Sequence, residues 1–345
     1  MSSPNPANDT RHDGRCVAVR APGRLHLGFL DPSATLGRRF GSLGLVIDGL
    51  ETAVELRAAA TAQAVAAAGI DRAELDRAAS HLASLQRAAG LDAPLQLHLA
   101  AALPAHAGFG SGTQLALAVG RAFCAWHGLD WPTERIARLL GRGTRSGIGI
   151  AGFDRGGLLL DGGPGADGSP APLVARIEPP PDWRVLLILD GAERGLSGSD
   201  EKQAIAALPA FGREHAAAVC HEVLMRVLPG AAGGDFAAFS AGIAAVQKLV
   251  GGHFAPAQGG RLYASAAVQR ACDWLAATRG LATGQTSWGP TGFALLPSKA
   301  EADAAAGALQ ASGVCAATLA LRIVAARSRG ASITHRAAGT PAPSS

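Results

Sequence analysis

Lysine is scarce in this chain, and long apolar runs are missing. Of the 31 basic residues only three are lysines, at positions 202, 248 and 299. Apolar residues make up 48% of the 345 residues, but no stretch reaches the roughly 18 consecutive apolar residues that a membrane helix needs. The polar residues 1–14 also lack the apolar segment of a signal peptide. We therefore expect a cytoplasmic protein that binds no membrane and has a large core.

Cysteine pairs of the kind that bind zinc or carry out redox chemistry are missing too. The chain has five cysteines, an odd number, and no two of them are separated by two residues. We expect free thiols, most of them buried, at these positions: Cys16, Cys124, Cys220, Cys272 and Cys315.

Positive charge is in slight excess, with a formal net charge of +4 and a pI of about 9.0. The arginines are scattered along the chain rather than clustered, so the sequence does not predict a nucleic-acid surface. Because lysines are few, a site for anions would depend on backbone N–H groups and on arginine guanidinium groups, which bind phosphate and carboxylate through paired hydrogen bonds.

Strand-like and helix-like segments alternate between two polar ends. We expect unfolded tails at 1–15 and 331–345, because these ends have too little apolar surface to fold. Three prolines at 179–181, followed by an apolar strand, mark a boundary near residue 180. The sequence thus predicts an α+β fold of two domains, 16–180 and 181–330.

The expected elements follow from the periodicity of the apolar residues. Residues 64–89 are expected to be helical, as one helix or as two helices separated near Gly69. Strands are expected at 17–20, 44–47, 52–57, 95–99, 158–161, 173–177 and 185–189, and further helices at 113–127, 133–140, 199–208, 213–227, 235–249 and 262–278, before a closing helix and strand.

A glycine-rich loop lies between the expected strand 95–99 and the expected helix 113–127. It reads Pro104-Ala-His-Ala-Gly-Phe-Gly-Ser-Gly-Thr-Gln114. Its glycines permit positive φ angles and close approach of a ligand to the backbone, and the helix that follows directs N–H groups and a positive dipole end toward an anion. The loop therefore predicts a phosphate site. The alternative is a simple turn in which Ser111 caps the helix.

The loop differs from two well-known phosphate motifs. It has no Gly-Lys-Ser/Thr ending of a Walker loop, and no acidic residue at the distance expected of a dinucleotide fingerprint. It resembles the Pro-x-x-x-Gly-Leu-Gly-Ser-Ser signature of the GHMP kinase superfamily, which is named for galactokinase, homoserine kinase, mevalonate kinase and phosphomevalonate kinase. Segments 21–31 and 285–292 fall where that superfamily has its other two motifs.

Six ordered segments resemble one branch of this superfamily, the β-ribofuranosylaminobenzene 5′-phosphate synthases. The resemblance spans roughly residues 17–327. It implies the GHMP-type two-domain fold, with an N-terminal domain like domain 2 of ribosomal protein S5 and a ferredoxin-like C-terminal domain. The segments are Arg24–Asp31, Arg39–Asp48, Gly110–Ala118, Arg142–Gly163, Arg194–Gly198 and Ser287–Phe293.

Two departures from the kinase patterns indicate a donor other than ATP. Residues 112–114 replace the small Ser-Ser-Ala run over which a nucleoside triphosphate lies in kinases, and residues 287–290 replace a run of glycines. The resemblance implies condensation of 5-phosphoribosyl 1-diphosphate with 4-aminobenzoate or 4-hydroxybenzoate, with loss of pyrophosphate and CO₂. It also implies Mg²⁺ as cofactor and a homodimer. An ATP-dependent small-molecule kinase of the same fold is the alternative.

Candidate roles in the site follow from the resemblance and from the chemistry of each side chain. Arg145 and His26 are candidate catalytic groups, and Asp161 is both a catalytic candidate and the first candidate for Mg²⁺, ahead of Asp31, Asp48 and Asp190. Each has a structural alternative: an ion pair, a core histidine or an aspartate turn. His106, within the loop, is a target for mutation. Candidates for binding substrate are Arg24, Gly108, Gly110, Ser111, Gly112, Thr113, Gln114, Ser146, Ser287 and Trp288.

Overall fold

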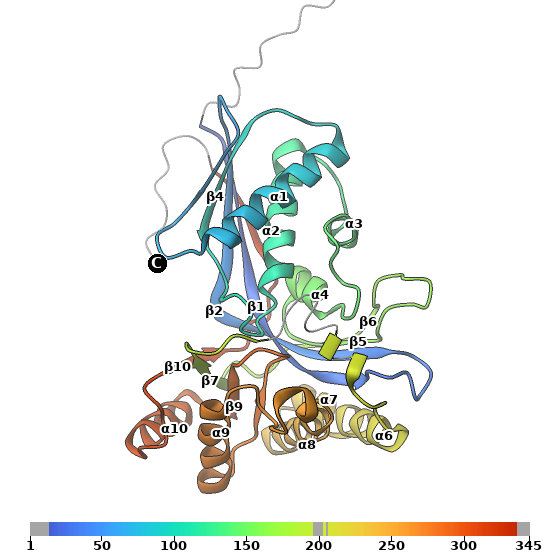
Figure 1. The fold of residues 1–345 in the computed structure, drawn as a ribbon, viewed down its shortest axis with the longest axis vertical. Coiled ribbons are helices and arrows are strands. Elements are labelled where there is room, and N and C mark those ends of the chain that lie inside the picture. Colours follow the sequence, from blue (N-terminus) through green and yellow to red (C-terminus); the bar gives the residue numbers. More distant parts are fainter. Residues whose placement is uncertain (1–13, 196–202, 205, 337–345) are drawn as a thin grey trace, which may run out of the picture.

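A computed structural model describes residues 14–195, 203–204 and 206–336. Two sheets divide the chain (Figure 1), one of seven strands and one of four strands. The chain passes from the first sheet to the second between β6 (Leu173–Ile177) and β7 (Arg184–Asp190), close to the three prolines at 179–181. No helix in the described ranges is both long and apolar enough to cross a membrane.

The larger sheet is built on a long antiparallel pair, β1 (Cys16–Asp31) and β2 (Phe40–Ala58). β2 also pairs with β4 (Leu95–Ala101) and with β5 (Leu158–Asp161). The helices α1 to α4 cover one face of this sheet (Figure 1), and their apolar sides form its main core. These helices are α1 (Arg72–Ala89), α2 (Ser111–His127), α3 (Thr133–Leu139) and α4 (Ile148–Arg155).

The smaller sheet has the strand order β10-β7-β9-β8. Its other strands are β8 (Thr283–Gln285), β9 (Gly292–Leu296) and β10 (Leu319–Ala325). Helices α9 (Ala266–Arg279) and α10 (Lys299–Ala311) pack on it. A second helical group packs under the far end of the β1–β2 pair (Figure 1). It comprises α6 (Arg213–Glu222), η2 (Val223–Val227), α7 (Leu228–Gly233), α8 (Phe236–Phe254) and the short turn η3 (Ala255–Gln258).

The structure corrects the helix expected at 64–89. The segment Gln63–Ala66 forms β3, which pairs with β4 in parallel, and helix α1 begins only at Arg72. Gly69 lies between the two elements with a positive φ of 82°. Asp71 caps α1 by accepting a hydrogen bond from the N–H of Ala73. The alanines of this segment are compatible with a helix, but pairing with a neighbouring strand edge overrides that preference.

A second correction concerns the C-terminal end. Part of the tail expected at 331–345 is the strand β11 (Ser332–Arg336), which pairs antiparallel with β1. The open edge of β1 has backbone N–H and C=O groups that need hydrogen-bond partners. The composition of residues 331–345 gives no indication that they supply these partners. Residues 1–13 and 337–345, and half of the helix expected at 199–208, lie outside the described residues, while residues 203–204 and 206–207 of that segment are helical.

Tight packing between α2 and α3 generates a test of the larger core. A Cβ atom at Gly120 would lie 2.2 Å from Cγ2 of the fully buried Ile136. We expect Gly120→Ala to lower the free energy of unfolding by about 1–3 kcal/mol through overpacking. In α10, nothing lies within 4 Å of a Cβ at Gly307, so Gly307→Ala should raise stability by about 0.5–1 kcal/mol. Chemical denaturation measures the free energy of unfolding of both variants, and equal changes in the two would contradict this packing.

Candidate active site

The glycine-rich loop connects β4 to α2 and leaves the start of that helix uncapped by any side chain. Gly108 and Gly110 have positive φ angles of 90° and 78°. Gly110, not Ser111, is the N-cap residue, and its carbonyl oxygen accepts hydrogen bonds from the N–H groups of Thr113 and Gln114. The expected capping by Ser111 is therefore wrong, whereas the choice between a simple turn and a phosphate site stays a prediction. Ser111 and Gly112 are the first two residues of α2. Their backbone therefore lies at the positive end of the helix dipole, a position that favours binding of an anion.

Two arginines lie against the glycines of this loop. Nη1 of Arg24 donates to the carbonyl oxygen of Gly108 at 2.7 Å. A Cβ at Gly110 would lie 3.0 Å from Cζ of Arg24, and a Cβ at Gly112 would lie 3.1 Å from Nη1 of Arg142. The glycines thus let two guanidinium groups approach the helix start. Arg142 was not selected from sequence, although it begins the segment that contains Arg145.

Further positive charge comes from α1, which the sequence did not connect with the loop. Burial and the charges of Arg142 and Arg77 lower the pKa of His81 to about 4. Burial and the charges of Arg77 and Arg194 also lower the pKa of His106. These shifts mean that arginines from three separate segments act on the surroundings of the loop. The sequence of α1 alone does not predict the effect of Arg77 on the loop, because this effect depends on the packing of α1 beside α2.

A short turn after β8 fastens the loop to the smaller sheet. Oγ1 of Thr286 donates to the carbonyl oxygen of Gly108 and accepts from the N–H of His26, both at 2.9 Å. The N–H of Ser287 donates to the carbonyl oxygen of His26 at 3.2 Å. A Cβ at Gly108 would lie only 2.2 Å from the carbonyl oxygen of Thr286. The three segments noted in the sequence, at 21–31, 104–114 and 285–292, therefore meet at one place.

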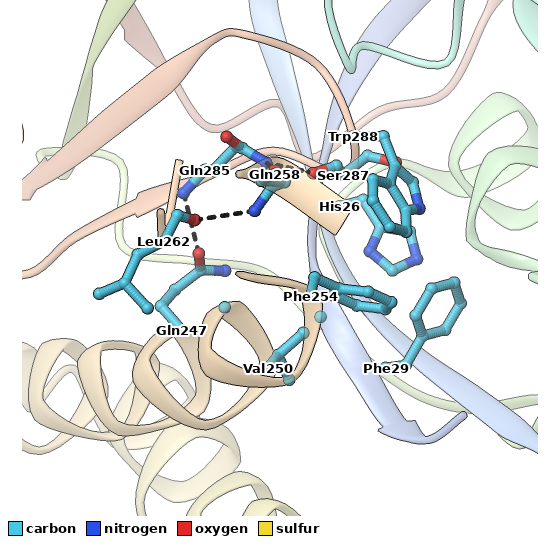
Figure 2. A pocket seen from close by; sticks show the side chains of 12 residues that line it. His26, Phe29, Gln247, Val250, Phe254, Gln258, Leu262, Gln285, Ser287 and Trp288 are labelled. Atoms are coloured by element: carbon cyan, nitrogen blue, oxygen red, sulfur yellow. Dashed lines mark hydrogen bonds between the residues drawn. The ribbon is translucent and has the colours of Figure 1, made fainter. Parts of the chain in front are cut away.

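An uncharged pocket opens beside this junction (Figure 2). The empty space in the pocket and at its mouth, open solvent included, is about 440 Å³. Aromatic rings line one side of it: His26 and Phe29 have ring centroids 4.5 Å apart, and Phe254 and Trp288 have theirs 4.6 Å apart. None of the described lining residues is Lys, Arg, Asp or Glu. The lining residues are His26, Gly28, Phe29, Gln247, Val250, Gly251, Phe254, Gln258, Leu262, Gln285, Ser287 and Trp288.

His26 is a neutral polar group between the loop and the pocket. It is 5% exposed, and its Nε2 has no hydrogen-bond partner in the described part of the chain. Burial, together with the charges of Arg24 and Arg145, lowers its pKa to about 3. At neutral pH the imidazole is therefore neutral, with one ring nitrogen that donates and one that accepts a hydrogen bond.

The carboxylate of Asp161 is buried and surrounded by hydrogen-bond donors of the protein. It is 1% exposed, and burial raises its pKa while its hydrogen bonds act in the opposite direction. Both oxygens are engaged by protein donors, so this carboxylate joins the turn before α4 to strands β2 and β5. Ser146, expected to bind substrate, is one of the donors. They are the N–H groups of Ser42, Gly147, Ile148 and Gly163 and the hydroxyl of Ser146.

The other expected polar ligands are engaged in a similar way. Asp31 accepts from Ser33, Thr35 and Leu36, Asp190 from Ala192 and Ser265, and Asp48 pairs with Arg327. The buried Gln114 donates to the carbonyl oxygen of Gly149 at 2.9 Å. Among the residues that the structure describes, no group of three His, Cys, Asp or Glu side chains is placed to hold a metal. These residues do not fit a Mg²⁺ site made of protein ligands alone.

The environment of Asp161 leads to a test of its role. In Asp161→Asn the amide nitrogen would face N–H and O–H donors, so we expect the free energy of unfolding to fall by about 1–3 kcal/mol. The exposed Asp167, which accepts from the N–H of Ser169, provides a control: Asp167→Asn should change stability by less than about 0.5 kcal/mol. A large loss of activity in Asp161→Asn at unchanged stability would instead point to a direct role in catalysis or metal binding.

Comparison with known proteins agrees with this geometry. The family model described as GHMP kinases N terminal domain matches residues 75–157. Among solved structures, homoserine kinase from Cytophaga hutchinsonii superposes with a TM-score of 0.62 at 17% identity, covering 97% of this chain and 100% of that one. Mevalonate pyrophosphate decarboxylase from Streptococcus pyogenes does so with a TM-score of 0.65 at 12% identity, covering 91% and 98%. These likenesses establish the GHMP kinase fold.

Curated relatives are more specific. The protein named Beta-ribofuranosylphenol 5'-phosphate synthase in Archaeoglobus fulgidus is 31% identical over 245 residues, which cover 68% of this chain and 76% of that protein. The protein of the same name in Methanothermobacter thermautotrophicus is 29% identical and covers 67% and 75%. The family expected from the ordered segments is confirmed: the chain belongs to the β-ribofuranosylphenol 5′-phosphate synthase family.

Proposed function

We propose that this protein condenses 5-phosphoribosyl 1-diphosphate with 4-hydroxybenzoate or 4-aminobenzoate, releasing pyrophosphate and CO₂ and joining ribose to the ring through a C–C bond. One observation carries the proposal. An arginine-flanked glycine loop, suited to an anion, lies directly beside an uncharged pocket with aromatic walls, suited to a benzene ring. The name shared by the curated relatives supports a synthase rather than a kinase.

The donor half of the reaction is assigned to the loop. As the C1–O bond of the donor breaks, its electron pair leaves with pyrophosphate and positive charge builds on the anomeric carbon. The guanidinium groups of Arg24 and Arg142 lie next to the backbone N–H groups at the start of α2, and together these donors would bind the leaving group's negative charge. Such preorganised donors stabilise developing charge most effectively where water is excluded.

The acceptor half is assigned to the pocket. The ring carbon that bears the carboxylate gives an electron pair to the anomeric carbon and forms the C–C bond. The bond to the carboxylate then breaks, its electron pair restores the aromatic ring, and CO₂ leaves. The rings of Phe29, Phe254 and Trp288 provide apolar walls for the benzene ring. The positive field of Arg24 and Arg145, which lowers the pKa of His26, would attract the carboxylate to the end of the pocket beside the loop.

Mg²⁺ remains a proposal that is tied to the donor. In many phosphate-binding sites this ion is held by one or two carboxylates together with substrate phosphates. The four candidate carboxylates, of Asp31, Asp48, Asp161 and Asp190, already have protein partners, so the steps above are assigned only to residues of the chain. The homodimer and the cytoplasmic location rest on family resemblance and composition and are proposed on that basis.

The reaction can be tested directly. The purified protein is incubated with 5-phosphoribosyl 1-diphosphate, Mg²⁺ and either aromatic acid labelled in its carboxyl carbon. Release of labelled CO₂ in equal amount to pyrophosphate supports the proposal. Consumption of ATP with a sugar or amino acid acceptor, and no labelled CO₂, would replace it with a kinase activity.

Gly110 provides the sharpest test of the loop. Ala at this position would be strained by the φ of 78° and would displace Arg24. We expect Gly110→Ala to raise KM for the phosphoribosyl donor about tenfold or more, the effect of losing a charge-assisted hydrogen bond. Gly128, at the other end of α2, has a φ of 67° and nothing within 4 Å of a Cβ.

The control variant Gly128→Ala carries the same backbone strain, about 1 kcal/mol, without touching an arginine. Its KM should equal that of the wild type. An unchanged KM in both variants, measured by steady-state kinetics at saturating aromatic acid, would remove the loop from the donor site.

A further inference from the structure

Three glutamines meet at the wall of the aromatic pocket (Figure 2). Gln247 comes from α8, Gln258 from the turn η3 and Gln285 from β8. Nε2 of Gln285 donates to Oε1 of Gln258 at 2.8 Å, and the N–H of Gln285 donates to Oε1 of Gln247 at 2.9 Å. We refer to these three residues as the glutamine cluster. It places neutral polar groups in a pocket that is otherwise mostly apolar.

Most of the hydrogen-bonding capacity of the cluster is already used by the protein. Nε2 of Gln258 donates to the carbonyl oxygens of Arg261 and Leu262. Nε2 of Gln285 also donates to the carbonyl oxygen of Ser287, and its Oε1 accepts from the N–H of Ala264. Gln258 and Gln285 therefore have no N–H left for a ligand, because a carboxamide has only two.

The capacity that remains is rich in acceptors. Nε2 of Gln247 donates to the carbonyl oxygen of Leu27 at 2.7 Å, which leaves this residue one N–H. Each of the three Oε1 atoms accepts a single hydrogen bond in the described part of the chain, so each keeps one lone pair. A ligand group that donates a hydrogen bond fits this cluster, whereas a group that only accepts does not.

The arrangement of the pocket determines how the benzene ring of the proposed acceptor would be oriented in it. The loop side is marked by Trp288, since a Cβ at the neighbouring Gly289 would lie 2.2 Å from the backbone of Ala107. Figure 2 shows Trp288 and His26 on one side of the pocket and Gln247 with Leu262 on the other. A ring whose reacting carbon faces the loop therefore directs its opposite carbon toward the glutamine cluster.

We propose that the glutamine cluster determines the specificity for the acceptor, by binding a hydrogen-bond donor on the ring carbon opposite the carboxylate. This inference rests on the proposed function for the direction of the ring. A hydroxyl donates one hydrogen bond and accepts one from Gln247, and an amino group donates two. The same substituents release electrons into the ring, so the cluster selects the rings that are able to attack an anomeric cation. Rings with methoxy or nitro groups at this position leave the remaining lone pairs of these oxygens without a donor.

Ligand selectivity tests the cluster without turnover. Isothermal titration of the full chain with 4-hydroxybenzoate, 4-aminobenzoate, benzoate and 4-methoxybenzoate should give Kd values about tenfold lower for the first two, since the hydrogen bonds that only these two can donate to the cluster are worth about this much. Equal Kd values across the series would overturn the proposal.

The variant Gln258→Met should reduce the preference for hydroxyl over methoxy at least threefold while the Kd of benzoate stays the same. A purely structural role would weaken all four acids by the same factor, and that outcome would also overturn the proposal. The carbonyl groups that Gln258 contacts belong to the exposed Arg261 and Leu262, so water can replace these two hydrogen bonds.

Neighbouring glycines of α8 provide a matched pair that tests the location independently. Gly251 lines the pocket, and a Cβ there has its nearest neighbour at 3.6 Å, whereas Gly252 is exposed with nothing within 4 Å. We expect Gly251→Leu to fill the pocket and raise the Kd of 4-hydroxybenzoate more than tenfold, and Gly252→Leu to leave it unchanged. Equal affinity in both variants would place the ring elsewhere.

The two proposals fail differently. Selective binding of the hydroxyl and amino acids without release of labelled CO₂ would refute the condensation and retain the cluster as a binding site. Labelled CO₂ from both 4-hydroxybenzoate and 4-methoxybenzoate at equal kcat/KM would refute the role of the cluster and retain the condensation.

Discussion

The hydroxyl group of Thr286 is the contact on which the site depends. Fully buried, it accepts from the backbone of His26 and donates to the backbone of Gly108, so it holds the first strand, the glycine loop and the smaller sheet in one position. Because Gly108 has no side chain, the two backbones approach more closely than any other residue would allow. Every other feature of the site, from the arginines to the aromatic walls, is placed relative to this junction.

Separation of charge is the second organising feature. Arginines lie against the glycines of the loop, and the pocket beside it has no charged side chain among its described lining residues. His26 lies at the border, and its lowered pKa records both conditions, burial on one side and positive charge on the other. A reaction between a polyanionic donor and an apolar ring needs this division, because conditions that favour one partner disfavour the other.

The sequence predicted the parts of the site that are determined by short, continuous stretches of residues. Glycines at 108, 110 and 112 and the motif at 285–292 specify turns and close approaches, so their positions could be recognised without a structure. Asp161 is ambiguous for the same reason: Asp before Gly signals a turn as well as a ligand. Here it accepts hydrogen bonds within a turn, and its role in catalysis stays a prediction. The contributions of Arg77 and of the glutamine cluster were not predictable. They depend on helix packing and on contacts between residues as far as 220 positions apart.

The strand β11 has a consequence for how this protein is made. It pairs with β1, so the first of the described strands to be synthesised waits for a partner that is synthesised last among the described elements. Until then the edge of β1 exposes unpaired backbone groups, the kind of surface at which nascent chains associate wrongly. The smaller sheet and its helices are in effect an insertion within the larger domain. Neither half of the gene would therefore be expected to encode an autonomous folding unit.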